Sequence, residues 1–316
     1  LGEPASRVKL IEEPDPEPGP GEVRLSVKAA PIHPADLLRI EGRYGSAPEP
    51  LPATPGAEAF GVVEKLGEGV EGLAVGQTVL PLGAGCWADK LISPAKALIH
   101  VPADVDPEQA AMFKANPATA EAMLGLVPLE PGDWVAQSAA NSAVGRLVIR
   151  FAKARGLRTV NVVRRADVAD ALKADGADAV VVDGGGDLAG AIAATGAAPK
   201  LALDAVGGRV TGALARAAAP GATVAVYGLL SGDEAQVDLR DLVFRRIALR
   251  GFWLADWFAA SSGREVRALY AALMERLQAG AFETAVEARY PLERVAEAVA
   301  HAGRSGRSGK ILLTTE

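Results

Sequence analysis

Two adjacent arginines, Arg164 and Arg165, follow the β-branched run from Val160 to Val163. In a dinucleotide-binding α/β unit, the second strand usually ends in an Asp or Glu whose carboxylate binds a ribose 2′-hydroxyl. No acid stands at that point, although Asp167 follows soon after. Two guanidinium groups can instead grip a 2′-phosphate through charge-assisted, bidentate hydrogen bonds. The pair therefore favours NADPH over NADH as a ligand, and a solvated basic turn is the alternative interpretation.

The segment from Val135 to Phe151, which reads VAQSAANSAVGRLVIRF, is a second candidate for ligand chemistry. Its pattern predicts a strand, a tight turn and a helix. Gly145 stands where the third glycine of a G-x-G-x-x-G motif allows close helix–strand contact, while Ala140 and Ser142 replace the first two glycines. Small residues let the backbone approach a pyrophosphate, which free amides at the helix N-terminus bind. We expect a pyrophosphate at Asn141, Ser142, Ala143, Val144 and Gly145, and an ordinary strand–helix turn is the alternative.

The elements that must position these residues alternate from about Ala118 onward. The expected strands are Trp134 to Gln137, Thr159 to Val163, Ala179 to Val182, Leu201 to Asp204, Thr223 to Tyr227 and Ala248 to Trp253. The expected helices are Ser142 to Ala154, Asp167 to Lys173, Leu188 to Ala194 and Arg209 to Ala218. Six strands that alternate with helices predict an α/β fold with a doubly wound parallel sheet. The strands are continuous apolar runs, as expected where helices cover both faces of a sheet.

The residues before this region are rich in Pro and Gly and carry short β-type runs, which predicts a β-rich domain. These runs include 23–27, 61–63 and 77–80. After Trp257 we expect two amphipathic helices, 265–279 and 292–302, and a final strand, 310–314, that returns to the N-terminal domain. The predicted domains are therefore 1–115 together with 260–316, and 116–259.

Composition excludes several classes of protein. The 316 residues carry a formal net charge of −6, which argues against general binding of nucleic acid or anionic membranes. A single cysteine excludes a disulfide framework within the chain and a four-cysteine zinc site. No signal peptide is visible, and no apolar run approaches the ~20 residues that span a bilayer. We therefore expect a cytoplasmic protein.

Seven motifs carry a resemblance to a known family: APIHPADLLRIEGRYG (30–45), NPATA (116–120), QSAANSAVG (137–145), VNVVRR (160–165), DAVGG (204–208), VYGLLSG (226–232) and LRGFWLADW (249–257). The chain resembles the zinc-free 2-enoyl thioester reductases of the medium-chain dehydrogenase/reductase superfamily, the mitochondrial-type enoyl-ACP/enoyl-CoA reductases, which stand near the quinone oxidoreductases. The resemblance covers nearly the whole chain. It implies a GroES-like catalytic domain beside a Rossmann-type domain, a role in fatty acid metabolism, and a homodimer through the strand near Leu249 to Trp253.

The same resemblance also bears on whether the protein binds zinc. Zinc enzymes of the superfamily carry a catalytic Cys and a Gly-His-Glu motif, whereas this chain has Gly56-Ala57-Glu58 and lacks the early cysteine. Catalytic zinc usually needs three protein ligands, and the spacing of His33, Glu58 and Cys86 does not support such a site. We predict no metal. We interpret His33 and His100 as structural residues and Cys86 as a small packed residue.

Without zinc, another group must handle charge on the substrate oxygen. The resemblance implies reduction of the double bond of a trans-2-enoyl thioester, carried on CoA or acyl carrier protein. Hydride addition to Cβ builds negative charge on the thioester oxygen, so a donor is needed there and a proton must reach Cα. Tyr44, in the glycine-flanked sequence Gly42-Arg43-Tyr44-Gly45, matches the catalytic tyrosine of the family. A packing or surface tyrosine is the alternative.

The resemblance places further residues near the cofactor. They are Asn116, Thr119, Tyr227, Gly228, Leu229, Leu230, Phe252, Trp253, Leu254 and Lys310. Trp257 is expected to line the entrance for the acyl chain. Each has a structural alternative: Asn116 is a good helix cap, Trp253 suits a subunit interface, Trp257 suits simple packing, and Lys310 suits solvent.

Two other functions remain open. A reductase of quinones or of another α,β-unsaturated carbonyl would share the fold and the cofactor, because fold alone does not give function. A non-catalytic NADPH-binding protein would share only the cofactor site, and its properties would not depend on Tyr44.

Overall fold

The computed structural model describes residues 1–45 and 50–315, which form two compact units. The first unit runs from Leu1 to Ala115 and resumes at Arg267, and the second runs from Asn116 to Val266. The sequence predicts the chain's return at residue 260, whereas in the structure the crossing lies inside helix α11 (Gly263–Gln278). Each unit has its own sheet and its own core.

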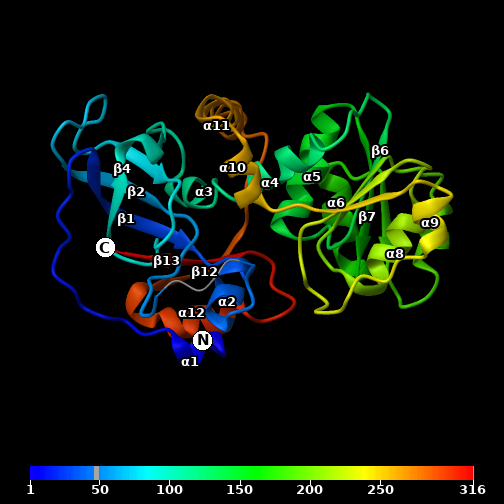
Figure 1. Ribbon diagram of the computed structural model, residues 1–316, viewed down its shortest axis with the longest axis horizontal. Coiled ribbons are helices and arrows are strands. Elements are labelled where there is room, and N and C mark those ends of the chain that lie inside the picture. Colours follow the sequence, from blue (N-terminus) through cyan, green and yellow to red (C-terminus); the bar gives the residue numbers. More distant parts are fainter. Residues whose placement is uncertain (46–49, 316) are drawn as a thin grey trace. The chain divides into compact units, whose positions relative to one another are not determined.

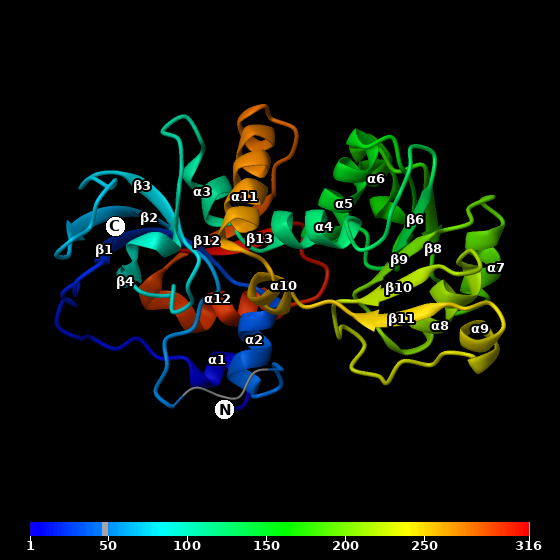
Figure 2. The same ribbon diagram turned by 45° about the horizontal axis from the view of Figure 1, so that its top comes forward.

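The sheet of the second unit is parallel throughout, with the strand order β11-β10-β9-β6-β7-β8 (Figures 1 and 2). Its strands are β6 (Trp134–Gln137), β7 (Arg158–Val163), β8 (Ala179–Val182), β9 (Leu201–Asp204), β10 (Thr223–Val226) and β11 (Ala248–Gly251). The order reverses at β6, as it does in the Rossmann fold. This arrangement confirms the predicted doubly wound sheet, and all six predicted strands are present.

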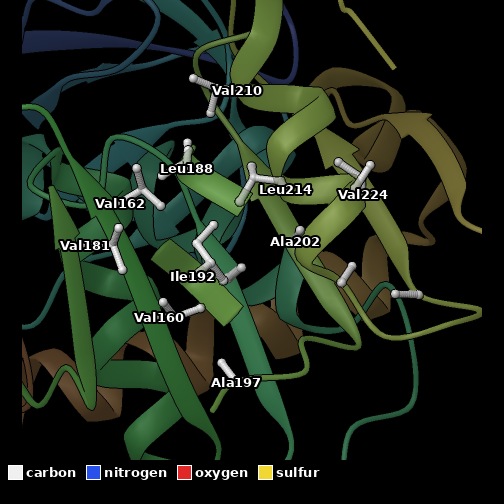
Figure 3. Packing of buried hydrophobic residues seen from close by; sticks show 14 of the residues in the cluster. Val160, Val162, Val181, Leu188, Ile192, Ala197, Ala202, Val210, Leu214 and Val224 are labelled. Atoms are coloured by element: carbon white, nitrogen blue, oxygen red, sulfur yellow. The ribbon is translucent and has the colours of Figure 1, made fainter. Parts of the chain in front are cut away.

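Helices cover both faces of this sheet. The helices of this unit are α4 (Asn116–Leu124), α5 (Ala143–Ala154), η2 (Ala166–Val168), α6 (Ala169–Asp175), α7 (Leu188–Ala193), α8 (Gly208–Ala217), α9 (Leu239–Val243) and α10 (Leu254–Ala260). Ile192 of α7 and Leu214 of α8 pack with Val162 in one buried cluster (Figure 3). The next strand residue, Val163, packs in a second cluster with Ile149 of α5. Neighbouring strand residues point to opposite faces, so both faces are buried and the strands are apolar throughout.

The sheet of the first unit is mixed, in the order β12-β13-β1-β2-β3-β5, with β4 also paired to β1. Its strands are β1 (Glu22–Pro31), β2 (Phe60–Leu66), β3 (Thr78–Pro81), β4 (Lys90–Pro94), β5 (Leu98–His100), β12 (Val286–Pro291) and β13 (Lys310–Thr314). The C-terminal strand β13 pairs with β1, which confirms the predicted return to the N-terminal domain. The sequence does not predict β12, which lies parallel to β13.

Helices accompany this sheet, and α11 is shared with the second unit. They are α1 (Pro4–Arg7), α2 (Pro34–Glu41), η1 (Ala95–Ala97), α3 (Pro107–Ala111), α11, η3 (Leu292–Arg294) and α12 (Val295–Ala302). Ala298 and Val299 of α12 pack against Val27, Ile32 and Leu313 in one buried cluster. The core therefore joins residues from the two ends of the chain. Within the described residues, no helix is long and apolar enough to cross a membrane.

Candidate functional site

The turn between β6 and α5 lies at the carboxyl edge of the parallel sheet. Ser142 caps α5, and its Oγ accepts a hydrogen bond from the backbone N–H of Gly145 at 3.1 Å. Ala139 adopts a positive φ of 47° in the turn, a conformation that non-glycine residues rarely adopt. A Cβ atom on Gly145 would lie 2.5 Å from the carbonyl oxygen of Ala140, so only glycine fits there. Asn141 is exposed in this turn, just before the first amides of α5.

A buried polar pair supports this turn from below. The Gln137 amide Nε2 donates to the carbonyl oxygen of Gly145 at 2.8 Å and to Asn161 Oδ1 at 2.7 Å. Asn161 in turn donates to Thr159 Oγ1 at 2.9 Å. These side chains tie β6, β7 and α5 together. This role is not predicted from the sequence, in which the local signal is one amide side chain in each of two mainly apolar strands.

Arg164 and Arg165 directly follow β7 at the same edge, and both are exposed. Arg165 Nε lies 3.5 Å from Asp167 Oδ1. In the described part of the chain, Arg164 makes no ion pair. The two guanidinium groups therefore stand in solvent at the end of the second strand of this unit, where a ribose 2′-substituent is read in this fold.

The ends of β9 and β10 border the same edge. Asp204 accepts hydrogen bonds from Ser138 Oγ and Thr211 Oγ1, both at 2.6 Å, and from two backbone amides of the following turn. It is a structural anchor. The Tyr227 hydroxyl is buried, and burial together with the Asp204 charge raises its pKa, which a contact with Ser142 partly offsets. A Cβ on Gly228 would meet the Ala205 carbonyl oxygen at 2.5 Å. Leu229 and Leu230 are both 61% exposed.

The sixth strand of the second unit ends two residues earlier than the sequence predicts. β11 stops at Gly251, Trp253 is the N-cap of α10, and Leu254 begins that helix. Phe252 still donates its amide to the Val226 carbonyl at 2.9 Å, so the hydrogen bonding to β10 continues one residue beyond β11. Trp257 lies on α10, half-buried, with its ring edge-on to that of Phe258 at 5.6 Å.

Asn116 and Thr119 lie within α4, and Asn116 is the first residue of the helix rather than the cap before it. Proline at the second helical position allows the helix to begin at Asn116, because the first-turn amides need no partner within the helix. Asn116 is 6% exposed, and among the described residues its Nδ2 has no hydrogen-bond partner. A buried amide without a partner is costly, so it is a candidate for contact with a ligand.

Tyr44 lies in the first unit, just after helix α2. Gly42 ends that helix in the left-handed conformation, with a φ of 77°. Tyr44 is half-buried, and the Arg39 guanidinium carbon lies 5.1 Å from the centre of its ring. A cation over the ring face restrains the orientation of the tyrosine. The helix therefore fixes the base of the loop that carries the predicted catalytic hydroxyl.

Lys310 lies in the same unit but not in solvent. It is 8% exposed, and its Nζ lies 3.0 Å from Nδ1 of His33. Nε2 of His33 contacts Oε1 of Glu58, which is fully buried, and the second oxygen of Glu58 accepts the Ala115 N–H at 2.7 Å. Burial would raise the pKa of Glu58, but the His33 contact, the Lys310 charge and the Ala115 hydrogen bond hold it below its ordinary value. From the sequence His33 is expected to be structural, and its contact with Lys310 is not predicted.

These residues do not fit a metal ion. Both ring nitrogens of His33 are engaged, and the cation beside them is the Lys310 ammonium. Burial raises the pKa of the Cys86 thiol to about 12, so this thiol is not available as a thiolate ligand at neutral pH. Across residues 1–45 and 50–315, no group of three His, Cys, Asp or Glu side chains could hold a metal.

Two family models match the chain. The Alcohol dehydrogenase GroES-like domain matches residues 19–103, and the Zinc-binding dehydrogenase domain matches residues 143–274. The first match lies in the β-rich unit and most of the second lies in the Rossmann-type unit. They support the predicted GroES-like and Rossmann-type fold, while the zinc in the second description has no counterpart among the ligands described above.

Curated proteins and solved structures give the same picture. The chain is 35% identical to the mitochondrial enoyl-[acyl-carrier-protein] reductase of Homo sapiens over 330 residues, covering 99% of this chain and 86% of that protein. A putative NADPH:quinone reductase from Bacillus thuringiensis is 26% identical, with a TM-score of 0.93 over 100% of this chain and 97% of that one. The ETR1P/NADP/crotonyl-CoA complex is 24% identical, with a TM-score of 0.84 over 96% of this chain and 93% of that one, a likeness of fold.

Proposed function

Because the chain belongs to the mitochondrial-type enoyl-[acyl-carrier-protein] reductase family of the medium-chain dehydrogenase/reductase superfamily, we propose that it reduces the double bond of a trans-2-enoyl thioester with NADPH. The observation that carries the proposal is the 35% identity to an enoyl reductase over 99% of the chain. The protein is a nicotinamide-dependent oxidoreductase that acts on a carbon–carbon double bond. The thioester is carried on CoA or on an acyl carrier protein.

The cofactor is a nicotinamide dinucleotide. The proposal that it is NADPH rather than NADH depends on residues of the second unit. The amides at the N-terminus of α5, capped by Ser142, would bind the pyrophosphate. Arg164 and Arg165 stand exposed after β7 and would bind a 2′-phosphate through charge-assisted hydrogen bonds. The buried Nδ2 of Asn116, which lacks a partner among the described residues, would donate to the nicotinamide end.

NADPH supplies the hydride for Cβ when it is bound. Tyr44 then acts on the substrate: its hydroxyl donates a hydrogen bond to the thioester oxygen, where negative charge develops, and relays the proton that Cα receives. Arg39, with its guanidinium over the Tyr44 ring, keeps the phenol oriented for this contact. Trp257 would line the entrance of the acyl chain.

Reduction of quinones is the second candidate. The observation that favours it is the similarity to a putative NADPH:quinone reductase, with a TM-score of 0.93 at 26% identity. A quinone needs the same cofactor but no proton at a thioester Cα, so Tyr44 would be dispensable. A non-catalytic NADPH-binding protein would reduce neither class of substrate.

A homodimer through the edge of the second sheet is part of the proposal. All residues of the edge strand β11 are exposed, and its free edge could pair with the same strand of a second copy. Beside it, α9 and the residue after it expose Leu239, Val243 and Phe244 by 71%, 64% and 79%. Such an apolar group next to a free strand edge suits an isologous interface. The cytoplasmic location expected from the sequence stays a prediction.

A substrate panel tests the function. NADPH oxidation is followed with crotonyl-CoA, a longer trans-2-enoyl-CoA and 1,4-benzoquinone, and NADH is tested in parallel. We expect turnover of the enoyl thioesters with a preference for NADPH. Turnover of benzoquinone alone would overturn the thioester assignment, and binding of NADPH without any turnover would support the non-catalytic alternative.

A further inference from the structure

A chain of hydrogen bonds in the first unit joins three buried side chains that the proposed reaction does not use. Glu58 precedes β2, His33 is the N-cap of α2, and Lys310 is the first residue of β13. Their exposed fractions are 0%, 6% and 8%. The chain runs from Lys310 Nζ to His33 Nδ1 at 3.0 Å, and from His33 Nε2 to Glu58 Oε1.

The donors and acceptors in this chain follow from the chemistry of its ends. While Lys310 is charged its ammonium can only donate, so Nδ1 of His33 then accepts a hydrogen bond from Nζ. Nε2 then carries the ring hydrogen and donates to Glu58, whose other oxygen accepts the N–H of Ala115. His33 thus links a buried cation to a buried anion, and burial of either charge alone would be costly.

The surroundings of Lys310 hold further charges. Asp36 on α2 accepts the backbone N–H of His33 at 2.8 Å, and Arg307 is half-buried in the loop before β13. Burial lowers the pKa of Lys310 to about 8, the charges of Glu58 and Asp36 oppose this shift, and the charge of Arg307 adds to it. Lys310 is therefore close to the point where it loses its proton in mildly alkaline solution.

The backbone of Lys310 is fixed independently of its side chain. Its N–H donates to the Ala285 carbonyl at 2.8 Å. In the loop before it, the Glu287 carboxylate accepts the N–H groups of Ser308 at 2.5 Å and Gly309 at 3.2 Å, and is held by His301 Nε2 at 2.9 Å. Among the described residues, His33 is the hydrogen-bond partner of the Lys310 side chain.

We propose that His33 is a positioning residue, which ties the Lys310 ammonium to Glu58 and so keeps it charged and oriented for an anionic ligand. An ammonium has three N–H donors, and His33 accepts one, so two remain for the ligand. The role rests on the proposed function, under which the ligand is the dinucleotide cofactor. Binding of the cofactor then depends on the charge of Lys310: affinity is full well below pH 8, where the lysine is protonated, and falls as the lysine loses its proton around and above pH 8.

The test measures the Kd of NADPH from pH 6.5 to 9.5 for the wild type and for variants. In the wild type we expect the Kd to rise above about pH 8, by up to about tenfold per pH unit if only charged Lys310 binds. His33→Leu removes the acceptor, so the midpoint should move at least one unit lower. His33→Asn keeps an acceptor near the place of Nδ1 and should restore the midpoint. Lys310→Met should bind weakly at every pH, without this midpoint.

A matched histidine variant and a direct titration of the lysine serve as controls. His100→Leu changes an exposed histidine on β5, outside the cluster, and should leave the profile unchanged. If His33→Leu does not fold, NMR of ε-carbon-labelled lysine in the wild type, assigned with Lys310→Met, measures the titration directly. A lysine midpoint near 10.5, or an unmoved midpoint in folded His33→Leu, would overturn the role of His33. Absence of NADPH binding at every pH would instead contradict the proposed cofactor, and the lysine titration would still decide whether His33 holds the charge.

Discussion

Tyr44 illustrates what a single residue can be predicted to do from sequence. Its glycine-flanked loop and its family motif identify a candidate donor, and the structure adds the Arg39 guanidinium over its ring. Lys310 shows the opposite case. The family resemblance implies a place near the cofactor, but its partner His33 lies 277 positions away, so no local pattern could reveal the contact.

Replacing Tyr44 with Phe removes only the hydroxyl. We expect kcat with crotonyl-CoA to fall by about 10²–10⁴-fold, the usual effect of a lost proton donor, while the Kd of NADPH stays unchanged. Tyr290→Phe is the matched control, because it removes a hydroxyl that bonds His301 at 3.0 Å, outside the proposed chemistry. Steady-state kinetics with both variants measures the difference. A Tyr44→Phe enzyme as fast as the wild type would exclude Tyr44 as the donor.

Replacing Arg164 and Arg165 with Ala tests the choice of cofactor. Each hydrogen bond to a charged group is worth about 1.5–3 kcal/mol, so the Kd of NADPH should rise by at least about tenfold. The Kd of NADH, which lacks the 2′-phosphate, should not change. Arg240→Ala, a change at another exposed arginine, serves as the control for lost positive charge. Equal losses for NADH and NADPH would contradict the assignment of these arginines to the phosphate.

At the scale of elements, the strands with the strongest apolar pattern are the ones that the sequence predicts correctly. The apolar strands of the second unit are all found, because each is a β-branched run between helical segments. In the first unit, β12 (Val286–Pro291) is missed, because all of its residues are exposed or half-buried and its sequence VEARYP carries no apolar run. The end of β11 is predicted two residues too late, since Phe252 and Trp253 favour strands but serve here to start α10.

Gly145 tests the turn between β6 and α5. A methyl group there would lie 2.5 Å from the Ala140 carbonyl oxygen, so Gly145→Ala forces the helix away from the strand. We expect a loss of about 1–3 kcal/mol in the free energy of unfolding, as for other overpacked sites, and weaker binding of NADPH. Gly184→Ala, where a Cβ meets nothing within 4 Å, is the control and should change stability little. Chemical denaturation compares them, and equal stability of the two variants would contradict the close approach.

At the scale of the whole molecule, the sequence predicts two domains and the return of the C-terminal strand, and the structure pairs β13 with β1. This pairing can be predicted, because the final strand comes after the six strands of the parallel sheet and the β-rich domain offers the other sheet. The buried link between Glu58, His33 and Lys310 is not, because three segments far apart in sequence supply one residue each. Long-range polar contacts of this kind depend on the packed fold and leave no periodicity in the sequence.

The exposed apolar residues beside β11 predict the assembly. A charge at Phe244, which is 79% exposed, would be buried in the proposed dimer without a partner, so Phe244→Glu should shift the protein to monomers. Val75→Glu places the same charge at a 64% exposed residue of the other unit and should leave the dimer intact. Light scattering after gel filtration gives the masses. A wild type that is monomeric, or a Phe244→Glu variant that stays dimeric, would contradict this interface.

The most direct measurement of the proposed function is product analysis by mass spectrometry. The protein is incubated with crotonyl-CoA and NADPH deuterated at the transferred position of the nicotinamide ring. We predict butyryl-CoA in equal amount to the NADPH consumed, with one deuterium at Cβ and a solvent proton at Cα. Unchanged crotonyl-CoA, in a preparation that oxidises the same NADPH with benzoquinone, would contradict the account.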